Sequence, residues 1–401
     1  MKKFFAILAA VAIVALAVPV LAADAPGPQV TVGGRMLTDF GYHNTSKELT
    51  SNGKNDVTTA FINLAGHSYL HAKFTSADKT SGGFIEFGLS SKVNDNESIS
   101  LRYAYGWWKV GNCKLLAGQD DGWVGTLKHA PKQYLGVSES AKLLLANWGY
   151  IYSARSPQVR FEYMKGNFGA SIALVQPMAE ATPGATGVGM TTGSASLPGG
   201  TDLYATLPRF DVAVQFTAGG FWAGPGFGWA QYKVEKGSVT MSDDTVTSWI
   251  GILPVKFTAG PFTAKAEVHY GQNNDYEWSG ELITGIKGLP RSMAFANSAG
   301  RIEDTKQLGG FLALEYKITP MFEVTAGYGI EKLTNDSWKK DAGYKNDDYT
   351  RSAWFVALPI TVTKNFSLHP EFNYFNYGDK IQNGQDFGNE WMLGLQFRFV
   401  F

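Results

Sequence analysis

The stretch GNEWMLGLQFRFVF, residues 388–401, decides the fold of this chain of 401 residues. A strand turns successive side chains to opposite faces, and every second side chain here is large and apolar, so one face of the segment is strongly apolar. The opposite face carries Gln396 and Arg398. The apolar face would cover the core of a soluble protein or meet lipid in a transmembrane barrel. This strand alone fits both. Its apolar members are Trp391, Leu393, Leu395, Phe397, Phe399 and Phe401.

The same alternation recurs along the chain and favours the barrel. Residues 61–75 have one apolar side and one side that is too polar for a folded core and suits a water-filled interior. The polar side carries Asn63, His67, Tyr69, His71 and Lys73. About sixteen such strands alternate between short turns and long loops, which is typical of outer-membrane barrels. Because a bilayer offers no partners for unpaired backbone groups, strands span it only as a closed barrel. The sequence therefore predicts an all-β fold, a transmembrane antiparallel β-barrel of about sixteen strands around an aqueous channel.

The first 22 residues have a different character. Lys2 and Lys3 precede an apolar run, and small residues follow it at positions 22 and 23. A positive start, a short apolar core and a small-residue end are typical of a secretory signal peptide; the alternative is a retained membrane anchor. We therefore expect a signal peptide over residues 1–22 and one barrel domain over residues 23–401. Beyond the apolar run no stretch of ~18 apolar residues could form a spanning helix.

Charge and motif content exclude several function classes. The chain has 35 basic and 35 acidic residues, so it has no basic field for nucleic acid. Cys113 is the only cysteine, so no intrachain disulfide forms. His67 and His71 would lie ~13 Å apart along a strand, too far to share one metal ion. The chain has no GxSxG, HExxH or phosphate-binding motif and no haem-attachment run. We therefore expect no enzyme activity, no cofactor and no metal.

The most informative internal stretch is LRYAYGWWKVGNCKLLAGQDDGW, residues 101–123. Two strands meet at the Gly111-Asn112 turn, which is a hairpin signal. A loop over about residues 121–150 follows, and then residues 152–157 read YSARSP. This order resembles general Gram-negative porins, in which a strand, a short glycine turn and a strand lead into "GRQD". This chain reads Gly118-Gln119-Asp120 and lacks that arginine.

The resemblance implies a fold, a location and partners. In that family the long loop folds into the barrel and narrows the pore, solutes cross by passive diffusion, and the protein is a homotrimer. It implies the bacterial outer membrane, with membrane lipids and lipopolysaccharide as surroundings. Phe401 resembles the terminal aromatic residue that the barrel assembly machinery reads. Three alternatives stay open: a substrate-selective channel, an outer-membrane enzyme, and a structural barrel that scaffolds an electron-transfer or surface complex.

Charged residues at a constriction select ions because field lines focus there. The inward loop is expected to contribute Asp120, Asp121, Lys128, Lys132 and Glu139. Strand parity predicts that the pore wall carries Arg35, Lys73, Arg102, Lys109, Arg160 and Arg398. Lys109 fits least well, because it and Arg102 differ in parity along one strand.

Overall fold

A computed structural model describes residues 27–50, 53–91, 98–135, 145, 148–153, 155–177, 202–235, 245–278, 289–296, 301–340 and 343–401. The expected signal peptide over residues 1–22 and the loop candidate Glu139 lie outside these residues. Within the described residues, no helix is long and apolar enough to cross a membrane.

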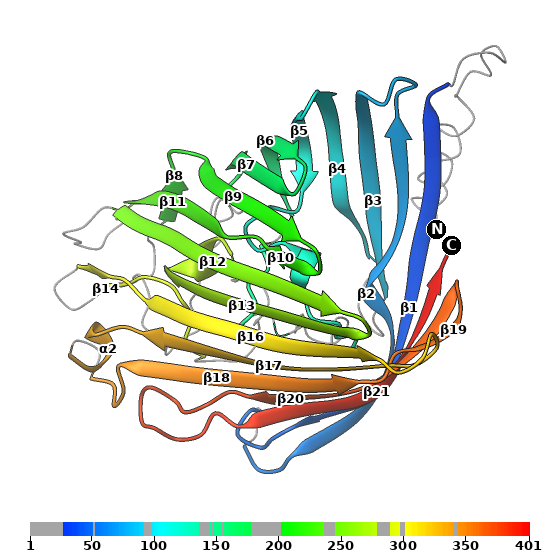
Figure 1. Cartoon of the computed structure of the whole chain (residues 1–401). Helices are drawn as coiled ribbons and strands as arrows, with labels where there is room; N and C mark the ends of the chain where they lie inside the picture. The colour runs from blue at the N-terminus through cyan, green and yellow to red at the C-terminus, as the bar shows by residue number, and fades with distance from the viewer. Residues whose placement is uncertain are drawn as a thin grey trace.

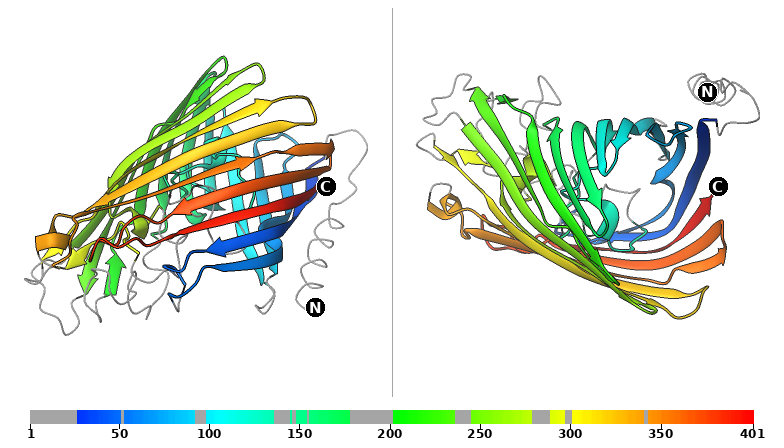
Figure 2. Two further views of the ribbon diagram at one scale, coloured as in Figure 1. Left: turned by 90° about the horizontal axis from the view of Figure 1, so that it is seen from below. Right: turned by 45° about the horizontal axis from the view of Figure 1, so that its top comes forward.

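Antiparallel strands form one large sheet that closes on itself, because β1 pairs with both β2 and β21 (Figure 1). Both views in Figure 2 show tilted strands around one interior. The strands of this sheet are β1 (Gln29–Thr45), β2 (Val57–Thr75), β3 (Ser81–Ser91), β4 (Ser98–Val110), β5 (Cys113–Asp120), β6 (Ser156–Lys165), β7 (Phe168–Val175), β8 (Asp202–Ala205), β9 (Arg209–Ala218), β10 (Phe221–Ala223), β11 (Gly226–Glu235), β12 (Thr245–Ala259), β13 (Phe262–Gln272), β16 (Lys306–Lys317), β17 (Glu323–Thr334), β18 (Asp348–Ala357), β19 (Ile360–Thr363), β20 (Phe366–Asn376) and β21 (Asn389–Val400).

Prolines explain why this sheet has 19 segments rather than sixteen. β8 and β9 both pair with β11, and the chain between them ends in Pro208. Similarly, Pro225 separates β10 from β11, and Pro359 separates β18 from β19. Proline has no N–H to donate, so it interrupts the hydrogen-bond ladder while the chain continues in the same direction. Joining the three interrupted pairs leaves sixteen strands among the described residues, which confirms the predicted closed barrel.

Small elements lie in the connections between the strands. The two-stranded sheet of β14 (Phe295–Ala296) and β15 (Ile302–Glu303) and the short helices η3 (Asn274–Tyr276) and α2 (Ser337–Lys340) belong to long loops. Short turns join the strands at the opposite end. Gly111 and Gly166, in two of these turns, both have φ of 56°, a value that residues with a side chain rarely adopt.

The two faces of the wall differ as the sequence predicts. On β21, Leu393 and Phe399 are 51% and 47% exposed outward, whereas Gln396 is buried inside. Similar rows of half-exposed apolar side chains cover the outer face of the other strands. Phe401 continues the outer row, and its backbone exchanges two hydrogen bonds with Gly34 of β1 at 2.9 and 3.1 Å. The barrel therefore presents an apolar belt outward and a polar surface inward.

Candidate pore and its internal loop

The described residues of the connection between β5 and β6 (121–135, 145, 148–153 and 155) lie inside the barrel and are fixed to β13. The His129 ring in η1 (Leu127–His129) forms a buried hydrogen bond with Glu267. The backbone N–H of Ile151 donates to the other oxygen of Glu267 at 2.8 Å. Lys265 Nζ donates to the carbonyl of Ala130 at 3.0 Å. One carboxylate thus holds two separate points of the loop against one strand.

A second carboxylate holds the loop on β20. Glu371 accepts hydrogen bonds from the backbone N–H groups of Tyr134 and Leu135 at 2.6 and 3.0 Å. On β21, the Gln396 amide donates to the carbonyl of Tyr134 at 2.7 Å and to Asp39 at 2.8 Å. The loop therefore crosses the interior from β13 to β20 and β21, as the inward-folded loop of the sequence prediction requires.

Close backbone contact with β16 and β17 places the return half of the loop. A Cβ atom at Gly329 would lie 1.9 Å from the carbonyl oxygen of Trp148, so no side chain fits there. Gly149 has φ of 106°, and a Cβ atom on it would lie 2.0 Å from the carbonyl oxygen of Gly310. The Trp148 ring packs on Phe375 of β20, with centroids 5.3 Å apart. Loop and wall form one hydrophobic core on this side.

Burial shows which side of the interior the loop leaves open. Inward side chains of β13 to β20 lie beneath the loop; Phe311, Phe355 and Asn373, for example, are at most 5% exposed. Several inward side chains of β2 to β4, such as Tyr69, Phe84 and Tyr105, stay partly exposed, although Asn63 and Glu86 are buried. Solvent therefore reaches the interior along β2 to β4.

The structure places four of the five loop candidates. Asp120 ends β5 and pairs with Arg160 at 2.6 Å. Asp121 accepts a hydrogen bond from the Tyr103 hydroxyl at 2.5 Å. Lys128 donates to Gln215 at 3.0 Å. Lys132 forms ion pairs with Glu323 and Glu315 at 2.5 and 3.1 Å. Of these four described residues, Asp121, Lys128 and Lys132 belong to the inward loop, and Asp120 belongs to the wall.

Wall candidates gather mainly near the open side. Arg35 lies over the Tyr69 ring at 4.8 Å and donates to the carbonyl of His67 at 3.0 Å. Lys73 is exposed on the same face of β2. Arg398 projects from the inner face of β21 and acts electrostatically on Arg35. Arg160 lies away from this group and is buried between Asp120 and Glu162.

A β-bulge removes the parity conflict between Arg102 and Lys109. Tyr103 pairs with Glu86 and Leu101 pairs with Phe87, so Arg102 is an extra residue in β4. Such a bulge turns two successive side chains towards one face. Arg102 accordingly reaches Glu86 at 2.6 Å, and Lys109 lies over the inward Trp107 ring at 4.8 Å. Both cations therefore line the interior.

Electrostatics distinguish the charged groups of the loop. Burial raises the pKa of the Asp121 carboxyl, an effect that Arg155 partly opposes. Burial alone would lower the pKa of Lys132, but Glu323 and Glu315 outweigh it and raise the pKa. Burial lowers the pKa of Lys128. On acidification, Asp121 thus loses its charge at a higher pH than an ordinary aspartate does.

Sequence reasoning missed the groups that hold the loop. Glu267 and Glu371 look like ordinary inward carboxylates, and only their depth beneath the loop identifies them as its anchors. Arg155 was also missed as a site residue, although it lies within the quoted run YSARSP. Its Nε lies 3.7 Å from Asp121, and its guanidinium lies 4.9 Å from the Tyr103 ring centroid. Within the described residues, no cluster of three or more His, Cys, Asp or Glu side chains is arranged to hold a metal.

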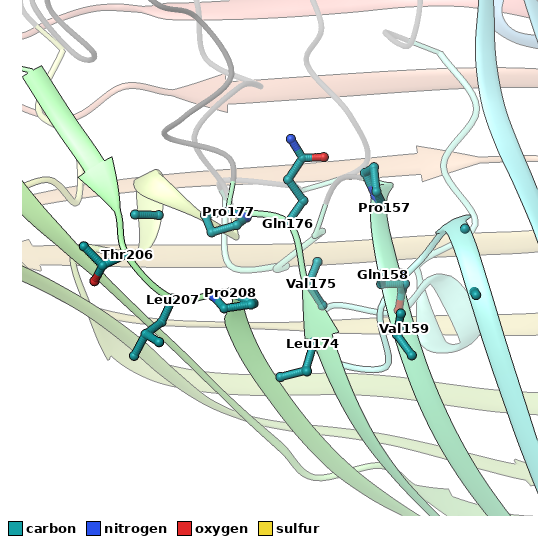
Figure 3. A pocket seen from close by; sticks show the side chains of 13 residues that line it. Pro157, Gln158, Val159, Leu174, Val175, Gln176, Pro177, Thr206, Leu207 and Pro208 are labelled. Atoms are coloured by element: carbon teal, nitrogen blue, oxygen red, sulfur yellow. The ribbon is translucent and has the colours of Figure 1, made fainter.

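A groove in the wall lies beside β7 (Figure 3). Pro157, Pro177 and Pro208 line it, and none of them can donate a backbone hydrogen bond. β7 pairs with β9 but not with β8, so the ladder opens at this point. Leu174 and Leu207 in the lining are about half exposed on the outer face. We interpret the groove as a local gap in strand pairing.

Solved structures share this architecture. An outer-membrane channel of Acinetobacter baumannii, DcaP, superposes with a TM-score of 0.67 at 18% identity, over 94% of this chain and 98% of that one. An anion-selective porin of Comamonas acidovorans gives 0.60 at 12%, over 93% and 100%. The trimer form of OmpT, an outer-membrane protein of Vibrio cholerae, gives 0.55 at 12%, over 94% and 100%. No protein-family model and no curated protein matches the sequence. The fold is therefore that of outer-membrane porins and channels.

Proposed function

We propose that this chain is an outer-membrane porin, without enzymatic activity, through which ions and small hydrophilic solutes diffuse passively. The observation that carries the proposal is the one-sided loop: it fills the interior along β13 to β20 and leaves polar and aromatic side chains solvent-exposed along β2 to β4. An interior that is partly filled and partly hydrated suits a narrowed channel.

The outer surface supports the membrane location. Large apolar side chains such as Ile62, at 64% exposure, and Phe399 cover the outer face of the strands. A continuous apolar surface of this kind is costly in water and favourable in lipid. The closed ladder also satisfies the backbone groups of the wall, which lipid cannot do.

Partners follow from this assignment as part of the proposal. The chain would contact membrane lipid and lipopolysaccharide, and the barrel assembly machinery would read Phe401 during biogenesis. A homotrimer is the expected assembly, and one structural neighbour is described as a trimer form. The pore-constriction role proposed for Asp121, Lys128 and Lys132 rests on their place in the inward loop.

Single-channel recording tests the proposal. The refolded protein is added to a planar bilayer, and conductance and reversal potential are measured in a salt gradient. Ohmic steps, in groups of three for a trimer, are the expected result. A barrel that shifts on heating in gel electrophoresis, and is therefore folded, yet never conducts would overturn the diffusion proposal and favour the scaffold.

A further inference from the structure

Partly exposed aromatic rings form a continuous row on the inner face of β2, β3 and β4. Tyr69 and His71 of β2 have ring centroids 5.7 Å apart, and His71 lies 5.4 Å from Phe84 of β3. Phe84 in turn lies 5.7 Å from both Tyr103 and Tyr105 of β4. The row faces the side of the interior that the loop leaves open. Its rings therefore offer apolar faces to solutes rather than to a core.

Guanidinium groups border this aromatic row. Arg35 lies 4.8 Å and Arg102 lies 5.8 Å from the Tyr69 ring centroid, and Arg155 lies 4.9 Å from that of Tyr103. Nε and Nη2 of Arg155 are buried and have no hydrogen-bond partner among the described residues. The planar guanidinium group, with its fork of N–H donors, is the cation best suited to pair with a carboxylate that reaches the row.

The charges around the row do not balance. Glu86 pairs with Arg102, and Asp121 lies 3.7 Å from Arg155. Within the part of the chain that the structure describes, no carboxylate forms an ion pair with Arg35. Three guanidinium groups therefore face two carboxylates, and the surplus charge favours anions.

We propose that the aromatic row and its arginines bind small aromatic carboxylates during passage. This inference rests on the proposed channel function and names a preferred solute class for it. An aromatic ring stacks on the row, and its carboxylate pairs with a bordering guanidinium. A small aliphatic carboxylate lacks the ring, and a neutral aromatic alcohol lacks the charge, so each uses only half of the site.

Current block in planar bilayers tests the preference. Benzoate is compared with acetate and with benzyl alcohol in a chloride background. Benzoate is expected to reduce the chloride current at about tenfold lower concentration than either of the others, since it alone makes both contacts. Equal effects of benzoate and acetate in a conducting channel overturn the aromatic track and leave the pore intact. Absence of any conductance overturns both proposals.

Two variants locate the site. Phe84→Leu removes the central ring of the row and is expected to weaken benzoate block about threefold to tenfold, with acetate unchanged. Phe257→Leu makes the same substitution on β12, where the side chain is 48% exposed on the outer face, and should leave block unchanged. Equal block in both variants refutes the site. If Phe84→Leu does not fold, Arg155→Lys serves instead: it keeps the charge but loses the planar fork, and unchanged benzoate block in it refutes the site.

Discussion

Glu371 offers the sharpest test of how the loop is held. Its carboxylate is 2% exposed and accepts the N–H groups of Tyr134 and Leu135. In Glu371→Ala both donors lose their acceptor beneath the loop. Each buried donor left unpaired costs about 1–3 kcal/mol, so the docked loop should lose about 2–6 kcal/mol relative to a released one. Even the lower value increases the released population roughly 30-fold.

Trypsin and conductance report the release. Lys128 and Lys132 lie in the docked part of the loop, so cleavage after them requires the loop to leave the wall. Glu371→Ala is expected to be cut there much faster than the parent protein and to show larger and noisier current steps, while the barrel still shifts on heating. Asp348→Ala is the matched control, because its ion pair with Lys332 joins two half-exposed side chains and contributes about 0–1 kcal/mol. Parent-like protease resistance and conductance in Glu371→Ala would show that this carboxylate does not hold the loop.

Three further predictions follow from single residues. Gly329→Val should force the loop backbone away from Trp148 and destabilise the docked loop by about 1–3 kcal/mol, measured as a lower midpoint in denaturant; an unchanged midpoint contradicts the close contact. On acidification, Asp121 should lose its charge at a higher pH than an ordinary carboxyl, which leaves the Arg155 charge unopposed. Reversal potentials should therefore move towards anion preference as pH falls. Asp121→Asn should abolish that shift, and a shift that persists in this variant rules Asp121 out. Phe401→Ala should lower the amount of barrel in the outer membrane of cells while the refolded protein keeps its conductance; equal amounts in cells would remove the assembly role of this residue.

The local alternation of apolar and polar residues was enough to predict the strands of the barrel wall. A residue's parity within its own strand decides which face it shares, so Gln396 and Arg398 could be placed on one face from β21 alone. The alternation repeated along the chain then placed that face inward. Parity fails where a strand contains an extra residue, as at Arg102. The sequence has no local signal for that bulge, because the bulge depends on how β3 and β4 pair.

Contacts between segments that lie far apart in the sequence limit how much of the site could be predicted. Glu371 meets the loop across 237 positions of sequence, and Glu267 meets His129 across 138. The aromatic row likewise depends on the register that brings Phe84 beside His71 and Tyr103. A single sequence specifies neither which remote residues meet nor the register in which neighbouring strands pair. The types of lining residue were therefore predictable, and their grouping was not.

Side-chain size explains why the loop docks on one side of the barrel. β17 presents a glycine where the loop backbone passes: a Cβ atom at Gly329 would lie 1.9 Å from the carbonyl oxygen of Trp148. β2 and β3 instead present the large rings of Tyr69, His71 and Phe84 at inward positions, which leave no such space for a crossing backbone. Small residues on one wall admit the loop, and large ones on the other keep it away. The position of the open side is therefore a consequence of side-chain volume, and the aromatic row both borders the passage and keeps it clear.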